Sequence, residues 1–382
     1  MPGRYQMKVE FFKHNIGPEE IAKVTEVLNS IFLTTGRVVQ EFEEKFSRYL
    51  GCKYTIGVTS CTAAIHLSLL AYEIGPGDEV ITTPMTFIAS ANSILHTGAK
   101  PVFVDVEPET GNIKVELIEE AITEKTKAIL PVHLYGQMCD MKRMEEIALK
   151  HKLVIIEDAA HCIEGERDEI KPGQLSGAAC FSFYATKNIT SGEGGAISTN
   201  NERIAEKLKQ LRLHGMTKGA AERYTNKYQH YDMEHLGWKY NMDNIHAGLL
   251  LNQLDEIEKH LSRREEICNM YEEAFCQVEE LDFPKIIPNS KSARHLFTIW
   301  VNPERRDEII WKLQEKGIGV AVNFRPVHLM KYYRNNFGFQ SGMFPIAEKI
   351  GNSTIALPLY PKLTNPQVKY VIEQVKEAVI PQ

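Results

Sequence analysis

Short apolar runs alternate with helical patterns between Tyr54 and about Asn200. Seven of these runs are rich in β-branched and aromatic residues, and several are continuously apolar instead of alternating with polar positions. Strands that are covered on both faces by helices have this pattern. The predicted strands are 54–60, 79–84, 101–106, 127–134, 153–158, 180–185 and 194–199. The pattern therefore predicts an α/β domain with a mostly parallel seven-stranded sheet.

Helical periodicity fills the segments between these runs and most of the C-terminal third. The predicted helices of the first part are 62–73, 140–152 and 201–215, with glycines near their ends. One long helical pattern, 243–275, bridges into a smaller α+β unit. That unit contains a predicted strand, 295–301, and predicted helices 305–317 and 365–380.

Length and composition agree with this two-part reading. A chain of 382 residues is long for one domain. We expect residues 1–250 to form an N-terminal segment and the large domain, and 251–382 to form the smaller one. Residues 1–6 are predicted to be poorly structured.

Charge and hydropathy exclude two classes of partner. The net charge is −6 and the basic residues form no stripe, which argues against a nucleic-acid surface. No apolar run reaches the roughly 18–20 residues that span a bilayer, and the N-terminus lacks the apolar core of a signal peptide. We therefore expect no nucleic acid and no membrane as partners.

The seven cysteines indicate a reducing compartment, because their number is odd and no CxxC pair occurs. We expect the protein to be cytoplasmic. Asp158, His161 and Cys162 could be read as a metal cluster, but a fourth ligand at suitable spacing is missing. The sequence therefore predicts no metal site.

Lys187 and Asp158 carry the clearest chemical signal. Lys187 follows the apolar run FSFYAT and precedes the glycine-rich turn SGEGG, whereas most lysines are solvated. Asp158 ends the buried-looking run LVIIED. Pyridoxal phosphate (PLP) enzymes need this pair, because a lysine forms a Schiff base with the cofactor aldehyde and an acid keeps the pyridine nitrogen protonated. Asp158 could instead cap a helix.

Four further positions could complete such a site, each with a simpler alternative. A helix that opens near Thr62 after a strand would present N–H groups to a phosphate, although Ser60 could simply cap that helix. Ser182 could also reach the phosphate. His161 could bond the cofactor's phenolic oxygen or be structural. Phe87 could stack on the ring or pack in the core.

The chain resembles the DegT/StrS-type nucleotide-sugar aminotransferases, which are PLP enzymes of the aspartate aminotransferase fold (fold type I). The matching motifs are LTTGRVVQEFEEKF (33–46), SCTAAIHLSLLA (60–71), GDEVITTPMTFIASANSI (77–94), GAKPVFVDVEPETGNI (98–113), KTKAILPVHLYGQ (125–137), EDAAH (157–161), FSFYATKNITSGEGG (181–195) and GWKYNMDNIHAGLLLNQL (237–254).

The resemblance implies a role for each matching residue. Lys187 would be the Schiff-base lysine and proton shuttle, Asp158 would bind the pyridine nitrogen, and His161 the ring oxygen. The residues that would bind the phosphate are Cys61, Thr62 and Ser182. Phe87 would lie against the ring. Many relatives have glycine where this chain has Cys61, a change that keeps a backbone donor.

The resemblance also implies a homodimer with shared active sites. The segment GWKYNM (237–242) would then reach the phosphate site of the other subunit. Many relatives carry asparagine at the position of Lys239 and arginine at that of Asn241. Either residue of this chain could therefore touch the phosphate.

Within the family, the sequence is most similar to enzymes that aminate C4 of a keto sugar. The implied partners are a nucleotide-linked keto sugar and L-glutamate/2-oxoglutarate, and the cofactor would alternate between PLP and PMP. Arg325 and His328 could contact the substrate. The alternatives are a 3-keto-sugar aminotransferase, a PLP-dependent sugar dehydratase, whose members replace the lysine by histidine, and a non-catalytic regulator. A nicotinamide dehydrogenase is disfavoured because GEGGAI lacks the GxGxxG spacing.

Overall fold

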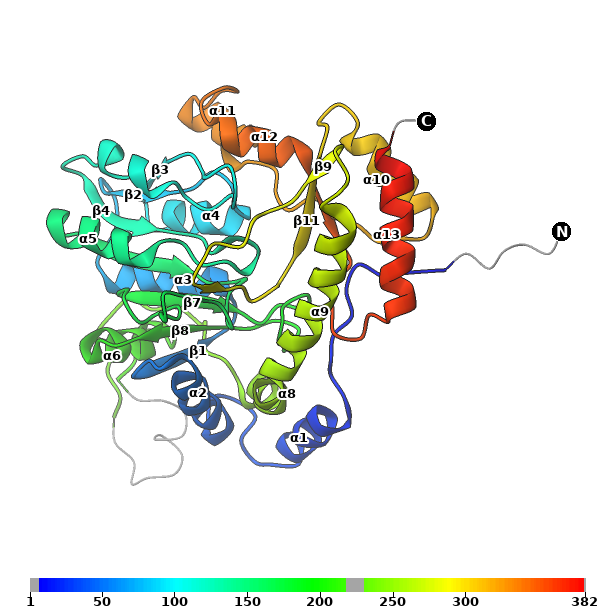
Figure 1. The fold of residues 1–382 in the computed structure, drawn as a ribbon. Coiled ribbons are helices and arrows are strands. Elements are labelled where there is room, and N and C mark those ends of the chain that lie inside the picture. Colours follow the sequence, from blue (N-terminus) through cyan, green and yellow to red (C-terminus); the bar gives the residue numbers. More distant parts are fainter. Residues whose placement is uncertain (1–6, 218–229, 381–382) are drawn as a thin grey trace.

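A seven-stranded sheet forms the centre of the computed structural model, which describes residues 7–217 and 230–380 (Figure 1). Its strands lie in the order β1-β8-β7-β5-β4-β2-β3, and only β8 runs antiparallel to its neighbours. This confirms the predicted mostly parallel sheet. The strands are β1 (Tyr54–Val58), β2 (Glu79–Thr82), β3 (Lys100–Phe103), β4 (Thr126–Leu130), β5 (Val154–Asp158), β7 (Ala178–Ser182) and β8 (Gly195–Thr199).

Helices cover both faces of the sheet, as the continuously apolar strands predict. Neighbouring residues of β7 belong to different cores: Ala179 and Phe181 face one, and Ala178 and Cys180 face the other. Helices α2 (Arg37–Leu50), α5 (Met141–His151) and α8 (Asn244–Asp255) pack on the first core. Helices α3 (Cys61–Ala71), α4 (Ile88–His96) and α6 (Glu202–Leu211) pack on the second.

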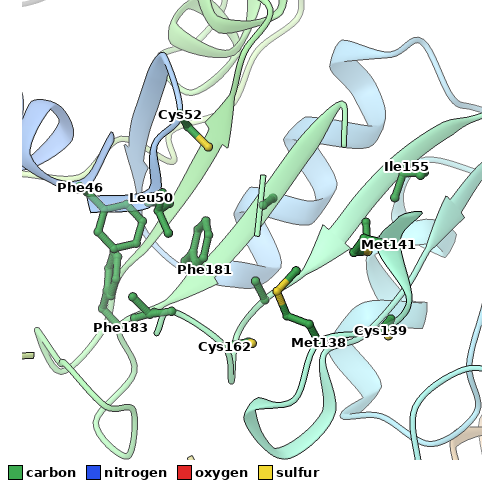
Figure 2. Packing of buried hydrophobic residues seen from close by; sticks show 14 of the residues in the cluster. Phe46, Leu50, Cys52, Met138, Cys139, Met141, Ile155, Cys162, Phe181 and Phe183 are labelled. Atoms are coloured by element: carbon green, nitrogen blue, oxygen red, sulfur yellow. The ribbon is translucent and has the colours of Figure 1, made fainter. Parts of the chain in front are cut away.

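Aromatic rings fill much of the first core. Phe46 of α2 meets Phe181 edge to face, with ring centroids 5.0 Å apart. Figure 2 shows Phe46 and Leu50 beside Phe181 and Phe183 at one end of this core. This packing anchors the end of β7 that leads to Lys187.

The long helical pattern 243–275 forms two helices, not one. Helix α8 ends at Asp255, and α9 (Ile257–Phe275) begins after Glu256. The break has a packing reason, because the apolar face of α8 packs on α1 (Pro18–Leu28) and the sheet domain, while that of α9 packs in the C-terminal core. In Figure 1, α9 runs between the sheet and the C-terminal helices.

The C-terminal part is the predicted α+β unit. Its sheet has the order β12-β11-β9, with β9 (Leu281–Asp282), β11 (Phe297–Val301) and β12 (Thr354–Leu357). The helices of this part are α10 (Arg306–Glu315), α11 (Lys331–Phe337), α12 (Pro345–Ser353) and α13 (Asn365–Val379). The smaller elements of the chain are β6 (Glu166–Arg167), β10 (Ser290–Lys291) and the 3₁₀ helices Val115–Leu117, Glu119–Ala121, Leu134–Gly136 and Val327–Leu329.

The start of the described chain also packs on the C-terminal part. Val9 pairs with Ile318 and lies in the same apolar core as α9 and α13. The division at residue 250 stays a prediction, and residues 1–6 lie outside the described residues. Among the residues that the structure describes, no helix is both long and apolar enough to cross a membrane.

Candidate active site

The predicted site residues gather at the carboxyl edge of the sheet. Asp158 is the last residue of β5, and Ser182 is the last residue of its parallel neighbour β7. Helix α3 begins at the same edge, after β1. Open α/β sheets place their ligands at this edge, because loops and helix N-termini meet there.

A cavity of about 570 Å³ lies at this edge, within the usual size range of cofactor sites. The structure brings seven of the predicted residues to its wall. They are Cys61, Thr62, Phe87, Asp158, His161, Ser182 and Lys187. Residues of the C-terminal part, including His295 and Phe324, close the other side.

Asp158 is buried and held by three donors. Ser90 Oγ donates to Oδ2 at 2.7 Å, the backbone N–H of Ala160 donates to Oδ1 at 3.1 Å, and the Cys61 thiol lies 3.9 Å from Oδ1. The chain turns after Asp158 and does not form a helix there, so the alternative helix cap is wrong. The carboxylate is therefore fixed in the cavity wall.

Lys187 lies in the turn after β7 and lines the same cavity. Burial lowers the pKa of its ammonium to about 8, and the nearby Asp158 carboxylate opposes this shift. A neutral amine can attack an aldehyde, whereas an ammonium cannot. Lys187 is therefore prepared for covalent chemistry close to neutral pH.

The first turn of α3 is the predicted anion site, and it opens on the cavity. Ser60 caps the helix, since its Oγ accepts the N–H of Ala63 at 3.0 Å, so the capping alternative is also real. The N–H groups of Cys61 and Thr62 precede that bond and point out of the helix end. Gly195 of β8 lies against this turn: an added Cβ would stand 2.4 Å from the Ser60 carbonyl carbon.

His161 and Phe87 both line the cavity. His161 is buried, and burial together with the Lys187 charge lowers its pKa well below the usual value. Its ring is therefore neutral. Phe87 is 56% exposed, so the alternative of ordinary core packing is wrong. Its ring centroid lies 5.9 Å from that of Phe324.

Cys162 does not share this site. Its thiol lies in the core on the opposite face of the sheet and donates to the carbonyl of Gly136 at 3.3 Å. The metal-cluster reading of Asp158, His161 and Cys162 therefore fails on geometry.

Four predicted residues lie away from the cavity. Lys239 is exposed and donates to Asn241 Oδ1, and Asn241 Nδ2 donates to Thr35 Oγ1 at 2.7 Å. Neither lines the cavity of its own chain, so their contribution to a second subunit stays a prediction.

The two predicted substrate contacts have different surroundings. Arg325 is exposed and lines a neighbouring hollow. His328 is enclosed, and its Nε2 lies 3.0 Å from Glu348 Oε1. A ligand in the cavity cannot reach that ring, so His328 is corrected to a packing position.

Sequence reasoning missed Ser90, His295 and Phe324. Ser90 lies inside the quoted motif TFIASANSI, and His295 is the first residue of the predicted strand 295–301, two residues before the observed β11 begins. Nothing in the local pattern marks them, since each becomes a site residue only through contacts with distant segments.

The donor set of the cavity fits PLP. A helix N-terminus and hydroxyl groups suit the phosphate, a carboxylate suits a protonated ring nitrogen, and a neutral histidine suits the ring oxygen. Lys187 suits the aldehyde, and Phe87 supplies an apolar wall. Gly195 leaves the anion-binding turn uncrowded by a side chain.

The comparisons with known proteins agree with this geometry. The DegT/DnrJ/EryC1/StrS aminotransferase family model matches residues 14–376. The uncharacterised protein MJ1066 of Methanocaldococcus jannaschii is 46% identical over 96% of this chain and 97% of its own length. The spore coat polysaccharide biosynthesis protein SpsC of Bacillus subtilis is 43% identical over 95% of both chains.

A solved structure extends the similarity to the fold. Spr1654 of Streptococcus pneumoniae, assigned as a sugar aminotransferase and solved in a PMP form, superimposes with a TM-score of 0.92. It is 34% identical, and the match covers 97% of this chain and 99% of that one. The same protein has been solved in a PLP form. These matches confirm the predicted fold, enzyme class and cofactor, and the chain belongs to the DegT/DnrJ/EryC1/StrS aminotransferase family.

Proposed function

We propose that this aminotransferase moves the amino group of L-glutamate to C4 of a nucleotide-linked keto sugar. The products are 2-oxoglutarate and a nucleotide-linked 4-amino-4-deoxy sugar, which we assign to the 4,6-dideoxy class. The observation that carries the proposal is that Lys187, Asp158 and His161 line one cavity. The name of SpsC and the assignment of Spr1654 support a sugar as the acceptor.

When bound, PLP supplies an aldehyde and an electron-withdrawing ring. Lys187 would hold the aldehyde, and its amine, once free, would accept the proton that leaves the α-carbon of the donor. Asp158 would keep the pyridine nitrogen protonated, and His161 would donate to the ring oxygen. The same residues would serve the second half of the reaction, in which Lys187 would return a proton to the sugar carbon that receives the amine.

A second hollow offers room for the nucleotide. Its volume is about 590 Å³, and it shares Phe87 and Phe324 with the cofactor cavity. Arg306 and the exposed Arg325 line it. We assign Arg325 to the diphosphate or to the donor's carboxylate, since a guanidinium binds either group with two parallel hydrogen bonds.

Exposed apolar side chains support a homodimer. Ile31 is 98% exposed and Leu236 is 79% exposed, and Leu236 directly precedes the segment 237–242. Such side chains gain free energy when a partner surface covers them. In a dimer, Lys239 or Asn241 would contact the phosphate in the partner's cavity.

The alternatives differ in chemistry. A sugar dehydratase or a regulator is disfavoured because the acid and the lysine that transamination needs are both in the cavity. A 3-keto-sugar aminotransferase would use the same residues, so only substrate tests separate it. We further propose a reducing, cytoplasmic location, since all seven cysteines are free.

A panel of substrates tests the proposal. The purified protein is mixed with glutamate and with UDP-, dTDP- and GDP-linked 4-keto or 3-keto sugars, and 2-oxoglutarate and the amino sugar are measured by mass spectrometry. We expect turnover with a 4-keto sugar and none with Lys187→Ala. Turnover confined to 3-keto sugars, or to sugars without a nucleotide, would refute it.

A further inference from the structure

A buried polar network surrounds Asn188, the residue that follows Lys187. Asn188 Nδ2 donates to Glu164 Oε2 at 2.8 Å and to the Ala293 carbonyl at 3.0 Å. The other carboxylate oxygen of Glu164 pairs with the buried Arg264 of α9. Both partners of Nδ2 can only accept hydrogen bonds, so the orientation of the Asn188 amide is determined.

This orientation sets the protonation of His295. Asn188 Oδ1 lies 3.0 Å from His295 Nδ1, and an amide oxygen can only accept. His295 therefore carries its proton on Nδ1. Burial, followed by the neighbouring His161, Lys187 and Arg264, lowers the pKa of His295 well below the usual value, so the ring is neutral and Nε2 is an unprotonated acceptor.

His161 has the opposite arrangement. Its Nδ1 lies 3.3 Å from the backbone nitrogen of Tyr135, which can only donate. A neutral His161 must then carry its proton on Nε2. The two histidines thus give the cavity that both line one donor and one acceptor.

The two rings also lie against each other, with an interplanar angle of 38°. Their centroids are 4.4 Å apart, and Phe324 lies on His161 at 5.7 Å with an interplanar angle of 21°. Gly136 makes this approach possible. It has a φ of +105°, and an added Cβ would lie 3.1 Å from His161 O and from His295 N.

We propose that His295 and Asn188 are positioning residues of the aminotransferase reaction: they clamp the His161 ring so that its Nε2–H stays directed at the cofactor's ring oxygen. The clamp links Lys187 to His161, because Asn188 directly follows the lysine in the chain. The inference rests on the family's cofactor chemistry and not on the identity of the sugar, so failure of the substrate panel would leave it intact.

The protonation pattern is tested first without cofactor. The full-length protein is labelled with ¹⁵N-histidine, and the two rings are assigned with single His→Asn variants. At pH 7 we expect nitrogen shifts of Nδ1–H for His295 and of Nε2–H for His161. A charged His295, or one protonated on Nε2, would overturn the proposal.

Two variants then separate the donor from the ring. His295→Asn keeps an N–H for Asn188 but removes the ring that lies against His161, and His295→Phe keeps a ring but removes the donor. We expect each to weaken PLP binding on the order of tenfold, because a hydrogen bond to the charged ring oxygen is lost or misaligned. His151→Asn, on the surface of α5, is the matched control.

The spectrum of the bound cofactor gives a second readout. A ring oxygen that loses its donor becomes more basic, so the pH midpoint of the visible absorbance should rise in both variants. Thermal unfolding confirms that each variant is folded. If either variant matches His151→Asn in affinity and midpoint, the corresponding half of the clamp is idle and the proposal is wrong.

Discussion

Two opposed electrostatic effects act on Lys187. Removal of its ammonium from water favours the neutral amine, while the Asp158 carboxylate favours the charged form, and burial is the larger effect. The same carboxylate is held by Ser90 and by the backbone of Ala160. At the scale of the residue, the site is thus a lysine whose proton affinity is lowered by burial and partly restored by its acid partner.

The pH dependence of cofactor capture tests this balance. Only the neutral amine attacks the aldehyde, so the rate at which the cofactor-free protein captures PLP should rise about tenfold per pH unit and level off above a midpoint near pH 8. Stopped-flow absorbance measures this rate. A midpoint near 10.5, the ordinary pKa of a lysine, would show that Lys187 is solvated.

Replacing the acid should move the same midpoint downward. Asp158→Asn removes the charge that raises the pKa of Lys187. The rate of PLP capture should therefore level off at a lower pH than in the wild-type protein. Asp255→Asn, at an exposed surface pair with Lys45, is the control and should leave the midpoint unchanged. An upward shift in Asp158→Asn contradicts this assignment.

At the scale of the element, the anion site depends on how closely β8 approaches α3. Gly195 pairs with Val58 of β1 and with Ser182 of β7, which places it directly under the first turn of the helix. The glycine-rich turn SGEGG after Lys187 was recognised in the sequence. Its last glycine, Gly195, also lets the first turn of α3 approach β8 closely. The absence of a side chain at Gly195 lets Ser60 and Cys61 rest on the strand.

Gly195→Ala should therefore weaken both cofactor binding and folding. The new Cβ would meet backbone atoms at 2.4–2.7 Å, so the α3 turn must shift. We expect a loss of about 1–3 kcal/mol in unfolding free energy and at least tenfold weaker PLP binding.

Gly75→Ala is the matched control, because the only atom near its added Cβ is a carbonyl oxygen at 3.7 Å. Equilibrium dialysis and urea unfolding measure both quantities. Equal PLP affinity in the two variants would show that the close contact at Gly195 has no role in the anion site.

At the scale of the molecule, the cavity joins parts that fold around different cores. The sheet domain supplies Asp158 and Lys187, and the C-terminal part supplies His295, Phe324 and Leu357. Glu164 and Arg264 pair across the same boundary. The chemistry thus needs both parts in place, and on our proposal it also needs a second copy of the chain.

Subunit mixing tests that last requirement. A heterodimer of Lys187→Ala with Lys239→Ala, or with Asn241→Ala, would retain one site with all its native residues. A statistical mixture should recover about one quarter of wild-type activity, since half of the dimers are mixed and half of their sites are intact. Differently tagged subunits allow the mixed dimers to be isolated. Isolated mixed dimers without activity would rule out shared sites.

The sequence alone determined the sheet, its covering helices and the placement of Lys187 and Asp158 at one cavity. Short, continuously apolar runs rich in β-branched and aromatic residues indicate buried strands. Lys187 directly follows such a run and Asp158 ends one, so burial and placement at the carboxyl edge were readable locally. The segment 243–275 was correctly predicted to be helical, but it forms two helices where one was expected. Periodicity alone does not show which core each turn faces.

Tertiary structure decided the rest. His328 and His295 are similar in sequence terms, yet one is enclosed beside Glu348 and the other lines the cavity beside His161. His295 meets His161, which is more than a hundred residues away in the sequence, whereas His328 is enclosed by contacts such as that with Glu348 of α12. The residues that react can be read from local pattern, whereas the residues that orient them depend on how the chain closes on itself.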